Sequence, residues 1–241
     1  MMSDSVYIKD VISKELDLEV SDVQAERFCD FYEMMIEKNK VMNLTRVTDF
    51  KESVQKHFVD SLSIVKCERP DMNKVNSLID LGSGAGFPGM PLKIMWPDCY
   101  VVMIDSVEKK VNFIREAAEN LCLSGIEAVH ERAEDLGRKE SYREKFDICT
   151  SRAVANMSTL SEYCLPFVKR GGYFVAYKSG DSKEEILDAG KAISLLGGKK
   201  PELYEFSLFD MRRILACVEK INNTSQKYPR KAGIPSRTPI R

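Results

Sequence analysis

The sequence predicts an α/β protein with a doubly wound, mostly parallel sheet of seven strands, preceded by a helical segment. Three observations lead to this fold class. From about residue 77 onward, short apolar runs alternate with stretches of helical length, which is typical of a parallel sheet covered by helices on both faces. The first run leads into a glycine-rich loop. The last two runs are too close together for a crossover helix and predict an antiparallel hairpin at the sheet edge.

Residues 1–65 are expected to form the helical segment. Apolar side chains recur there at three- and four-residue spacing, as on one face of a helix. Asn43-Leu44-Thr45 predicts a polar turn between two such stretches. Each stretch begins with a capping pattern, a short polar side chain followed three residues later by Glu or Gln: Ser21 with Gln24, and Asp49 with Glu52.

Residues 66–225 are expected to hold the Rossmann-like sheet. The expected strands, in chain order, are Leu78–Leu81, Tyr100–Ile104, Ile126–His130, Phe146–Thr150, Tyr173–Tyr177, Leu203–Leu208 and Ile214–Val218. Residues 226–241 follow as a basic tail with five positive and no negative side chains and three prolines. We expect this tail to be irregular and to stay loose until it meets a polyanion.

Composition excludes several classes of protein. The chain has 241 residues, of which 44% are hydrophobic and 30% charged, with a net charge of −1, so a disordered chain is not expected. The longest clean apolar run is far too short to cross a membrane, and the first residues lack a signal peptide, so we expect a cytoplasmic protein. Seven cysteines without a CxxC pair, and only two histidines, argue against a metal site and against Ser/His/Asp or Cys/His hydrolases.

The strongest local signal is the loop Gly82-Ser83-Gly84-Ala85-Gly86, which lies between the first strand and a helix. Glycines let the backbone turn sharply and approach a ligand closely. The spacing G-x-G-x-G, followed at once by Phe87, differs from the G-x-G-x-x-G of dinucleotide sites and favours a ligand without a pyrophosphate. A tight turn with no ligand is the alternative.

Asp105 closes the second strand, 23 residues after Gly82. A carboxylate at this place can accept hydrogen bonds from ribose hydroxyls, although it could equally cap the helix that begins near Val107. Arg152 follows the fourth strand at the carboxyl edge of the sheet, where open α/β sheets place their chemistry. A guanidinium directly after a buried strand needs an anionic partner.

Together these residues resemble a known family, the bacterial 16S rRNA guanine-N(7) methyltransferases, also called glucose-inhibited division protein B. The resemblance spans roughly residues 20–240. It rests on the motifs in their order: Asn43-Leu44-Thr45, His57-Phe58-Val59-Asp60-Ser61, the loop ending Gly86-Phe87-Pro88-Gly89, Arg132-Ala133-Glu134, Ser151-Arg152-Ala153 and Tyr228-Pro229-Arg230-Lys231. It implies a class I S-adenosylmethionine methyltransferase fold and methyl transfer to one guanine of 16S rRNA, with naked rRNA, an assembly intermediate or the whole small subunit as substrate. The family often has Glu where this chain has Asp105.

The resemblance also implies roles for individual residues. Arg152 and Lys178 are the expected catalytic positions, and Lys178, Arg230 and Lys231 are the basic positions expected to face RNA, with an ordinary solvated charge as the alternative for each. His57 is expected to order the helical segment against the catalytic domain rather than to act as an acid or base. The S-adenosylmethionine site is expected to contain Gly82, Ser83, Gly84, Gly86, Phe87, Asp105, Ala133, Glu134 and Arg152.

The chemistry of the carboxyl edge agrees with an N(7) product. N(7) of guanine has a lone pair and no proton, so its methylation needs positioning and charge stabilisation but no general base. Enzymes that methylate exocyclic amines would show an Asn/Asp-Pro-Pro-aromatic run after the fourth strand, where this chain has Ser151-Arg152-Ala153. Two other functions stay open: a non-catalytic rRNA-binding or assembly factor, and an NAD(P)-dependent oxidoreductase. The protein is expected to act as a monomer without a membrane partner.

Overall fold

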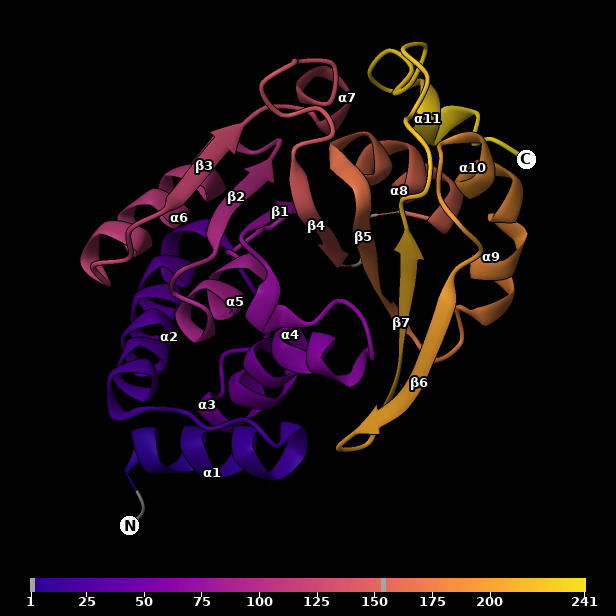
Figure 1. Ribbon diagram of the computed structural model, residues 1–241. Helices are drawn as coiled ribbons and strands as arrows, with labels where there is room; N and C mark the ends of the chain where they lie inside the picture. Colours follow the sequence, from indigo (N-terminus) through magenta and orange to yellow (C-terminus); the bar gives the residue numbers. More distant parts are fainter. Residues whose placement is uncertain (1–2, 153–154) are drawn as a thin grey trace.

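The computed structural model describes residues 3–152 and 155–241 and shows one seven-stranded sheet with helices on both faces (Figure 1). The strand order is β3-β2-β1-β4-β5-β7-β6. The strands are β1 (Ser77–Leu81), β2 (Tyr100–Asp105), β3 (Ile126–His130), β4 (Phe146–Arg152), β5 (Val168–Ser179), β6 (Glu202–Leu208) and β7 (Met211–Glu219).

The expected topology is confirmed. Strands β1 to β5 pair in parallel, β7 runs antiparallel to β5, and β6 pairs with β7 as the antiparallel hairpin at the edge. Strand β5 begins five residues before its expected start at Tyr173. Its first residue, Val168, pairs with Phe146, and the register shifts between this pair and the pair of Tyr173 with Ile148. Strand β1 has β2 on one side and β4 on the other, so the strand order changes direction there. At such a switch point a crevice opens at the carboxyl edge of a parallel sheet.

Neighbouring residues of one strand pack into different cores, as the two-residue period of a strand requires. Leu78 of β1 belongs to the core that also holds Phe28 of α2 (Asp22–Met42) and Phe113 of α6 (Glu108–Asn120), whereas Ile79 belongs to the core that holds Leu160 of α8 (Met157–Cys164). Helices α2, α5 (Gly89–Met95) and α6 therefore cover one face, and α8, α9 (Lys183–Asp188) and α10 (Gly190–Leu195) the other (Figure 1).

The helices have the bounds α1 (Asp4–Leu16), α2 (Asp22–Met42), α3 (Phe50–Ser53), α4 (Asp60–Leu62), α5 (Gly89–Met95), α6 (Glu108–Asn120), α7 (Ala133–Leu136), α8 (Met157–Cys164), α9 (Lys183–Asp188), α10 (Gly190–Leu195) and α11 (Ile234–Arg237). Short 3-10 turns lie at Ser63–Lys66, Met72–Lys74 and Leu165–Phe167. None of the helices among the described residues has both the length and the apolar content that a membrane crossing needs.

The N-terminal segment is helical, and both of its expected helix starts exist. Ser21 and Gln24 form a complete capping box, and Asp49 accepts a hydrogen bond from the backbone N–H of Glu52. The turn at Asn43 has a left-handed backbone. One feature was not expected: Val54–Val59, which contains His57, is a π-helical turn (η1), a rare geometry that is frequent at functional sites.

The expectation that residues 226–241 are loose is wrong. The segment contains helix α11 and lies against α7 and α8 (Figure 1). Buried charged side chains of the sheet domain hold its backbone, including Arg143, which donates to the carbonyl of Tyr228, and Glu134, which accepts from the N–H of Gly233. Composition suggested disorder because these partners lie far away in the sequence.

Candidate active site at the carboxyl edge of the sheet

The glycine loop turns at the end of β1 through three residues in the left-handed region, Gly82, Gly84 and Gly86, with φ of 72°, 59° and 98°. The N–H groups of Gly82 and Ser83 both donate to the carbonyl of Ile104 at the end of β2, at 2.8 and 3.1 Å. The loop is thus fixed to the neighbouring strand, and side chains other than hydrogen would strain its backbone.

Asp80, inside β1, holds the far end of the same loop. Its carboxylate is fully buried and accepts hydrogen bonds from the N–H of Gly89 (3.1 Å) and the hydroxyl of Thr150 (3.0 Å). Burial raises the pKa of this carboxyl to about 6. A Cβ on Gly89 would lie 2.6 Å from Met103, so only glycine permits this close approach. Sequence reasoning missed both roles, although an acidic residue in an apolar strand was a visible signal.

Asp105 holds the start of α6, as the alternative role considered for it required, and it also binds the glycine loop. Its Oδ2 accepts from the N–H of Gly84 and its Oδ1 from the N–H of Val107, both at 2.9 Å, so the carboxylate ties the glycine loop to the start of α6. The Nζ of Lys110 lies 3.9 Å away. Each carboxylate oxygen can accept a second hydrogen bond, and Asp105 borders a cavity, so a ribose hydroxyl can still bind.

This cavity, of about 460 Å³, opens at the carboxyl ends of β1, β2, β3 and β4. The predicted residues that line it are Gly82, Asp105, Ala133, Glu134 and Arg152. Other lining residues come from the segment after β2, from α8 and from the C-terminal part of the chain: Ser106, Val107, Lys110, Leu160, Tyr163, Gly233 and Ser236. None of these seven residues was predicted. Those of α8 and of the C-terminal part reach the cavity only through the tertiary fold.

The remaining predicted cofactor residues do not line the cavity. Ser83, Gly84 and Gly86 belong to the glycine loop but do not line the cavity. The hydroxyl of Ser83 donates to the carbonyl of Asp80. The Phe87 ring is only 5% exposed and packs beside Phe31. These residues support the site rather than forming its surface in this structure.

The Phe87 ring contacts both a histidine and an arginine. The ring of His57 stacks on it with centroids 4.6 Å apart, and the guanidinium of Arg152 lies 5.1 Å from its centroid. The Nε2 of His57 pairs with the hydroxyl of Thr45 at 2.8 Å, while Nδ1 is buried and has no hydrogen-bond partner among the described residues. Burial, followed by the charge of Arg152, lowers the pKa of His57 to about 4. A neutral imidazole therefore joins the helical segment to the glycine loop.

The anionic partner expected for Arg152 is Asp60 of the helical segment, whose Oδ2 lies 3.1 Å from Nη1. The same Nη1 donates to the carbonyl of Lys56 at 3.2 Å. Toward the described residues Arg152 thus donates only through Nη1, which leaves Nε and Nη2 for a ligand at the cavity. Ala153, the next residue of the predicted motif, lies outside the described residues.

The residues predicted to face RNA differ in their surroundings. Lys178 is 9% exposed and pairs with Glu185 at 2.8 Å while also donating to the carbonyl of Ala155. Arg230 pairs with the buried carboxylate of Glu162, so its guanidinium does not point freely into solvent. Lys231 is exposed. None of the three lines the cavity.

The cavity fits an adenosyl ligand. Its volume exceeds the lower limit of typical small-molecule sites, about 300 Å³. Asp105, whose carboxylate can accept hydrogen bonds from ribose hydroxyls, lies at one side of the cavity. Ala133 and Glu134 line another part of the cavity. The side chain of Leu160 supplies apolar surface for a ring system.

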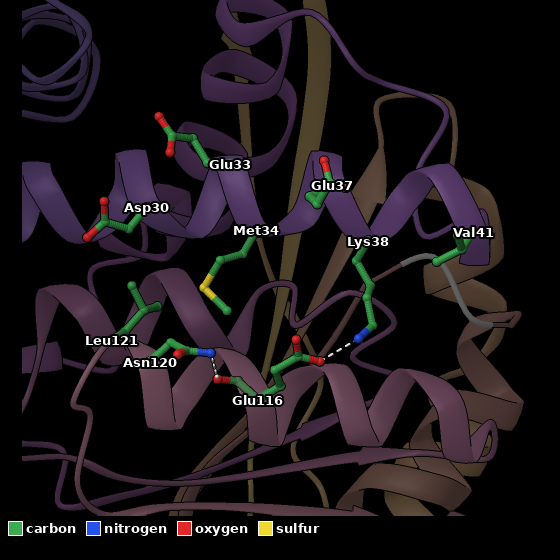
Figure 2. A pocket seen from close by; sticks show the side chains of 9 residues that line it. All are labelled: Asp30, Glu33, Met34, Glu37, Lys38, Val41, Glu116, Asn120 and Leu121. Carbon is green, nitrogen blue, oxygen red and sulfur yellow. Dashed lines mark hydrogen bonds and ion pairs between the residues drawn. The ribbon is translucent and has the colours of Figure 1, made fainter.

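A second hollow, between α2 and α6, is larger, about 680 Å³, but its chemistry differs (Figure 2). It is lined by four carboxylates, while its one lysine, Lys38, pairs with Glu116 across the groove (Figure 2). It lies away from the glycine loop and Asp105, and its negative charge disfavours a polyanionic substrate. We therefore assign the site to the smaller cavity at the carboxyl edge.

Comparison with protein families gives one match that covers most of the chain. The family model described as rRNA small subunit methyltransferase G (GidB) matches residues 24–223. A protein of Lachnoclostridium phytofermentans with the name "Ribosomal RNA small subunit methyltransferase G" is 46% identical over 242 residues, which cover 100% of this chain and 98% of that protein. A protein of the same name from Leuconostoc mesenteroides is 45% identical over 90% of this chain and 91% of its own length.

Solved structures agree on the fold. The crystal structure of a SAM dependent methyltransferase from Aquifex aeolicus superposes with a TM-score of 0.51 at 17% identity, covering 69% of this chain and 93% of that one. At this identity the likeness concerns the fold alone. The expected class I methyltransferase fold is confirmed.

Proposed function

The chain belongs to the rRNA small subunit methyltransferase G (GidB) family, and from this membership and the geometry of the cavity we propose that it methylates N(7) of one guanine in 16S rRNA. It is an S-adenosylmethionine-dependent methyltransferase. Family membership removes the two alternatives considered from the sequence, a non-catalytic assembly factor and an NAD(P)-dependent oxidoreductase.

One observation carries the choice of N(7). The cavity joins Asp105, Glu134 and Arg152, and the described residues that line it include no cysteine and no histidine. A site without a thiol or an imidazole lacks the side chains that most often hold a substrate covalently, which suits direct transfer to an acceptor atom that has a lone pair and loses no proton. Positioning and charge stabilisation are then what the protein has to supply.

The residues divide this work among them. When bound, S-adenosylmethionine supplies a methyl group on a positively charged sulfur. Asp105 would hold the ribose, and the backbone at Ala133 and Glu134 would hold the adenine. Arg152, through Nε and Nη2, would orient an anionic group at the edge of the cavity, while Asp60 and the Phe87 ring hold the guanidinium in place.

The RNA would approach from outside this edge. In this proposal Lys178 and Lys231 contact phosphate, the helical segment 1–65 packs against the methyltransferase domain 66–225, and residues 226–241 complete the domain. The protein would act in the cytoplasm as a monomer on 16S rRNA of the small ribosomal subunit.

Mapping of rRNA modifications tests the proposal. Purified protein, S-adenosylmethionine and small subunits that lack the modification should yield one N(7)-methylguanine in 16S rRNA, identified by mass spectrometry of nuclease fragments. Borohydride and aniline should then cleave the RNA at that base, and primer extension should stop there. Arg152→Ala is the matched inactive control. Methyl transfer to another atom, or to another class of RNA, would refute the assignment.

A further inference from the structure

The C-terminal segment, which we define as residues 224–238, is fixed to the sheet domain at three places along its length. Arg143, Glu162 and Glu134 make these contacts, and their side chains are 8%, 1% and 5% exposed. Charged side chains are rarely buried unless they are paired, so each of these contacts holds a group that would otherwise be costly to bury.

The first contact fixes the start of the segment. Nη2 of Arg143 donates to the carbonyl oxygens of Thr224 (2.7 Å) and Ser225 (3.2 Å), and Nη1 donates to that of Tyr228 (2.9 Å). In addition, Nη2 of Arg138 donates to the carbonyl of Pro229 at 2.6 Å. Four backbone carbonyls within residues 224–229 are thus bound by two arginines of the sheet domain.

The second contact is an ion pair. Nε and Nη2 of Arg230 bind the two carboxylate oxygens of Glu162 at 2.9 and 2.6 Å, and the backbone N–H of Arg230 also donates to Oε1 at 2.7 Å. Bidentate geometry of this kind is the strong form of a charge-assisted hydrogen bond. It fixes the direction in which the chain continues toward the cavity.

The third contact lies at the cavity itself. The N–H of Gly233 donates to Oε1 of Glu134 at 2.8 Å, and the hydroxyl of Thr159 donates to the carbonyl of Pro235 at 3.1 Å. Gly233 has a φ of 81°, a conformation that favours glycine. Gly233 and Ser236 line the same cavity as Glu134 and Asp105.

We propose that the C-terminal segment is a wall of the cofactor cavity and that Gly233 and Ser236 contact the adenosine half of S-adenosylmethionine. The inference rests on the proposed function and assigns to that site residues that neither the glycine loop nor the strand ends supply. The proposal also explains why Glu134 of α7 and Glu162 of α8 are buried, because their carboxylates hold the C-terminal segment in position at the cavity. Small-molecule sites bury most of their ligand's surface, and this segment supplies the side that the sheet leaves open.

A bulky side chain on the wall tests the proposal. Ser236 is exposed and lies on the short helix α11, so Ser236→Trp should fold while its indole reduces the space in the cavity. Ser194, an exposed serine on the short helix α10 away from the cavity, gives the matched control Ser194→Trp. By calorimetric titration, Ser236→Trp should bind S-adenosylhomocysteine about tenfold or more weakly, a loss of about 1.4 kcal/mol. Ser194→Trp should bind like the wild type.

The outcomes separate this proposal from the proposed function. Wild-type protein that fails to bind S-adenosylhomocysteine would refute the proposed function. Wild-type protein that binds and methylates rRNA, together with a folded Ser236→Trp variant of unchanged affinity, would refute only the wall.

Limited proteolysis of the wild type gives a test that needs no variant. Trypsin can cut after the exposed residues Lys231 and Arg237 in the segment, and after the exposed residue Lys199, which does not border the cavity. Saturating S-adenosylhomocysteine should slow cleavage after Lys231 and Arg237 several-fold more than cleavage after Lys199. Equal protection at all three sites would reflect only global stabilisation and would count against the wall.

Discussion

Arg152, at the end of β4, and Asp60, in the N-terminal segment, form an ion pair of 3.1 Å that joins the helical segment to the carboxyl edge of the sheet. Asp60 is 5% exposed and also pairs with Arg213 of β7 at 2.7 Å. One buried carboxylate thus holds two guanidinium groups from different strands. The N-terminal segment is therefore joined to β4 and β7 by ion pairs at the edge of the sheet.

The first prediction concerns the stability that this carboxylate provides. Asp60→Ala leaves two guanidinium groups without their counter-charge, so the free energy of unfolding should fall by about 3–5 kcal/mol. Arg152→Ala should cost less, because Asp60 keeps Arg213 as a partner. Urea unfolding measures both. Asp181→Ala, which breaks an exposed ion pair with Arg212, should stay near the wild type, and equal losses for all three variants would contradict the prediction.

The second prediction concerns His57. Its pKa in the folded protein is lowered to about 4, first by burial and then by Arg152, against the opposing effects of Asp60 and Glu52. The unfolded chain binds a proton below its ordinary pKa of about 6.5, whereas the folded protein does so only near pH 4. The stability linked to this group is therefore fully present above pH 6.5 and is lost as pH falls toward 4.

Between pH 7 and pH 5 this linkage should amount to about 2 kcal/mol of unfolding free energy. His57→Phe keeps an aromatic ring against Phe87 and removes the titration, so its stability should depend less on pH by about that amount. Urea unfolding at several pH values measures the difference. The second histidine, His130, is exposed, and His130→Ala should retain the wild-type pH dependence.

Local sequence patterns sufficed for the elements of the fold. The apolar runs, the capping box at Ser21 and the close spacing of β6 and β7 each depend on residues near one another in the chain, and the structure confirms them. The glycine loop and Asp105 could be placed at one edge because parallel strands bring their carboxyl ends together.

Long-range pairing explains what the sequence did not predict. Arg230 pairs with Glu162 across 68 residues, and Gly233 with Glu134 across 99, so composition alone made the C-terminal segment look loose. Lys220 is fully buried and donates to the carbonyl of Leu165, 55 residues away, although lysine is normally a surface residue. Which side chain meets such a group is decided by packing of the whole domain.

The third prediction separates two neighbouring charges of the C-terminal segment. Arg230→Ala leaves the buried carboxylate of Glu162 unpaired and should lower the unfolding free energy by about 3–5 kcal/mol. Lys231→Ala should leave stability unchanged. It should reduce the slope of log affinity for RNA against log salt by about 0.7–0.9, because one phosphate contact is lost. A wild-type salt slope for Lys231→Ala would show that this lysine does not touch phosphate.

The fourth prediction tests the ribose contact. Asp105→Ala removes hydrogen bonds of a carboxylate, which contribute about 1.5–3 kcal/mol, so S-adenosylhomocysteine should bind roughly 10- to 150-fold more weakly. The loop should also loosen, because Gly84 and Val107 lose their acceptor, and thermal stability should fall. Calorimetric titration below the melting temperature isolates the effect on binding. Asp98→Ala, an exposed carboxylate in the turn before β2, is the control, and equal affinities of both variants would exclude the ribose contact.

The last prediction concerns the route of the methyl group, which we expect to pass directly to the base without an enzyme-bound intermediate. Two cysteines lie in the elements that border this edge, Cys149 in β4 and Cys164 at the end of α8, and both are fully buried. Burial holds the pKa of Cys149 well above its ordinary value, so this thiol stays protonated and is a poor nucleophile. Cys149→Ala and Cys164→Ala should therefore retain methylation of small subunits at near the wild-type rate.

Arg152→Ala and Lys178→Ala should lower the same rate by orders of magnitude, because positioned charges account for much of the stabilisation in such a transfer. Single-turnover assays with radiolabelled methyl groups measure all four variants, and circular dichroism shows which are folded. A methylated enzyme trapped by acid quench would contradict direct transfer, because it requires the methyl group to be held covalently by the protein. A folded cysteine variant without activity would contradict the expectation that neither thiol takes part.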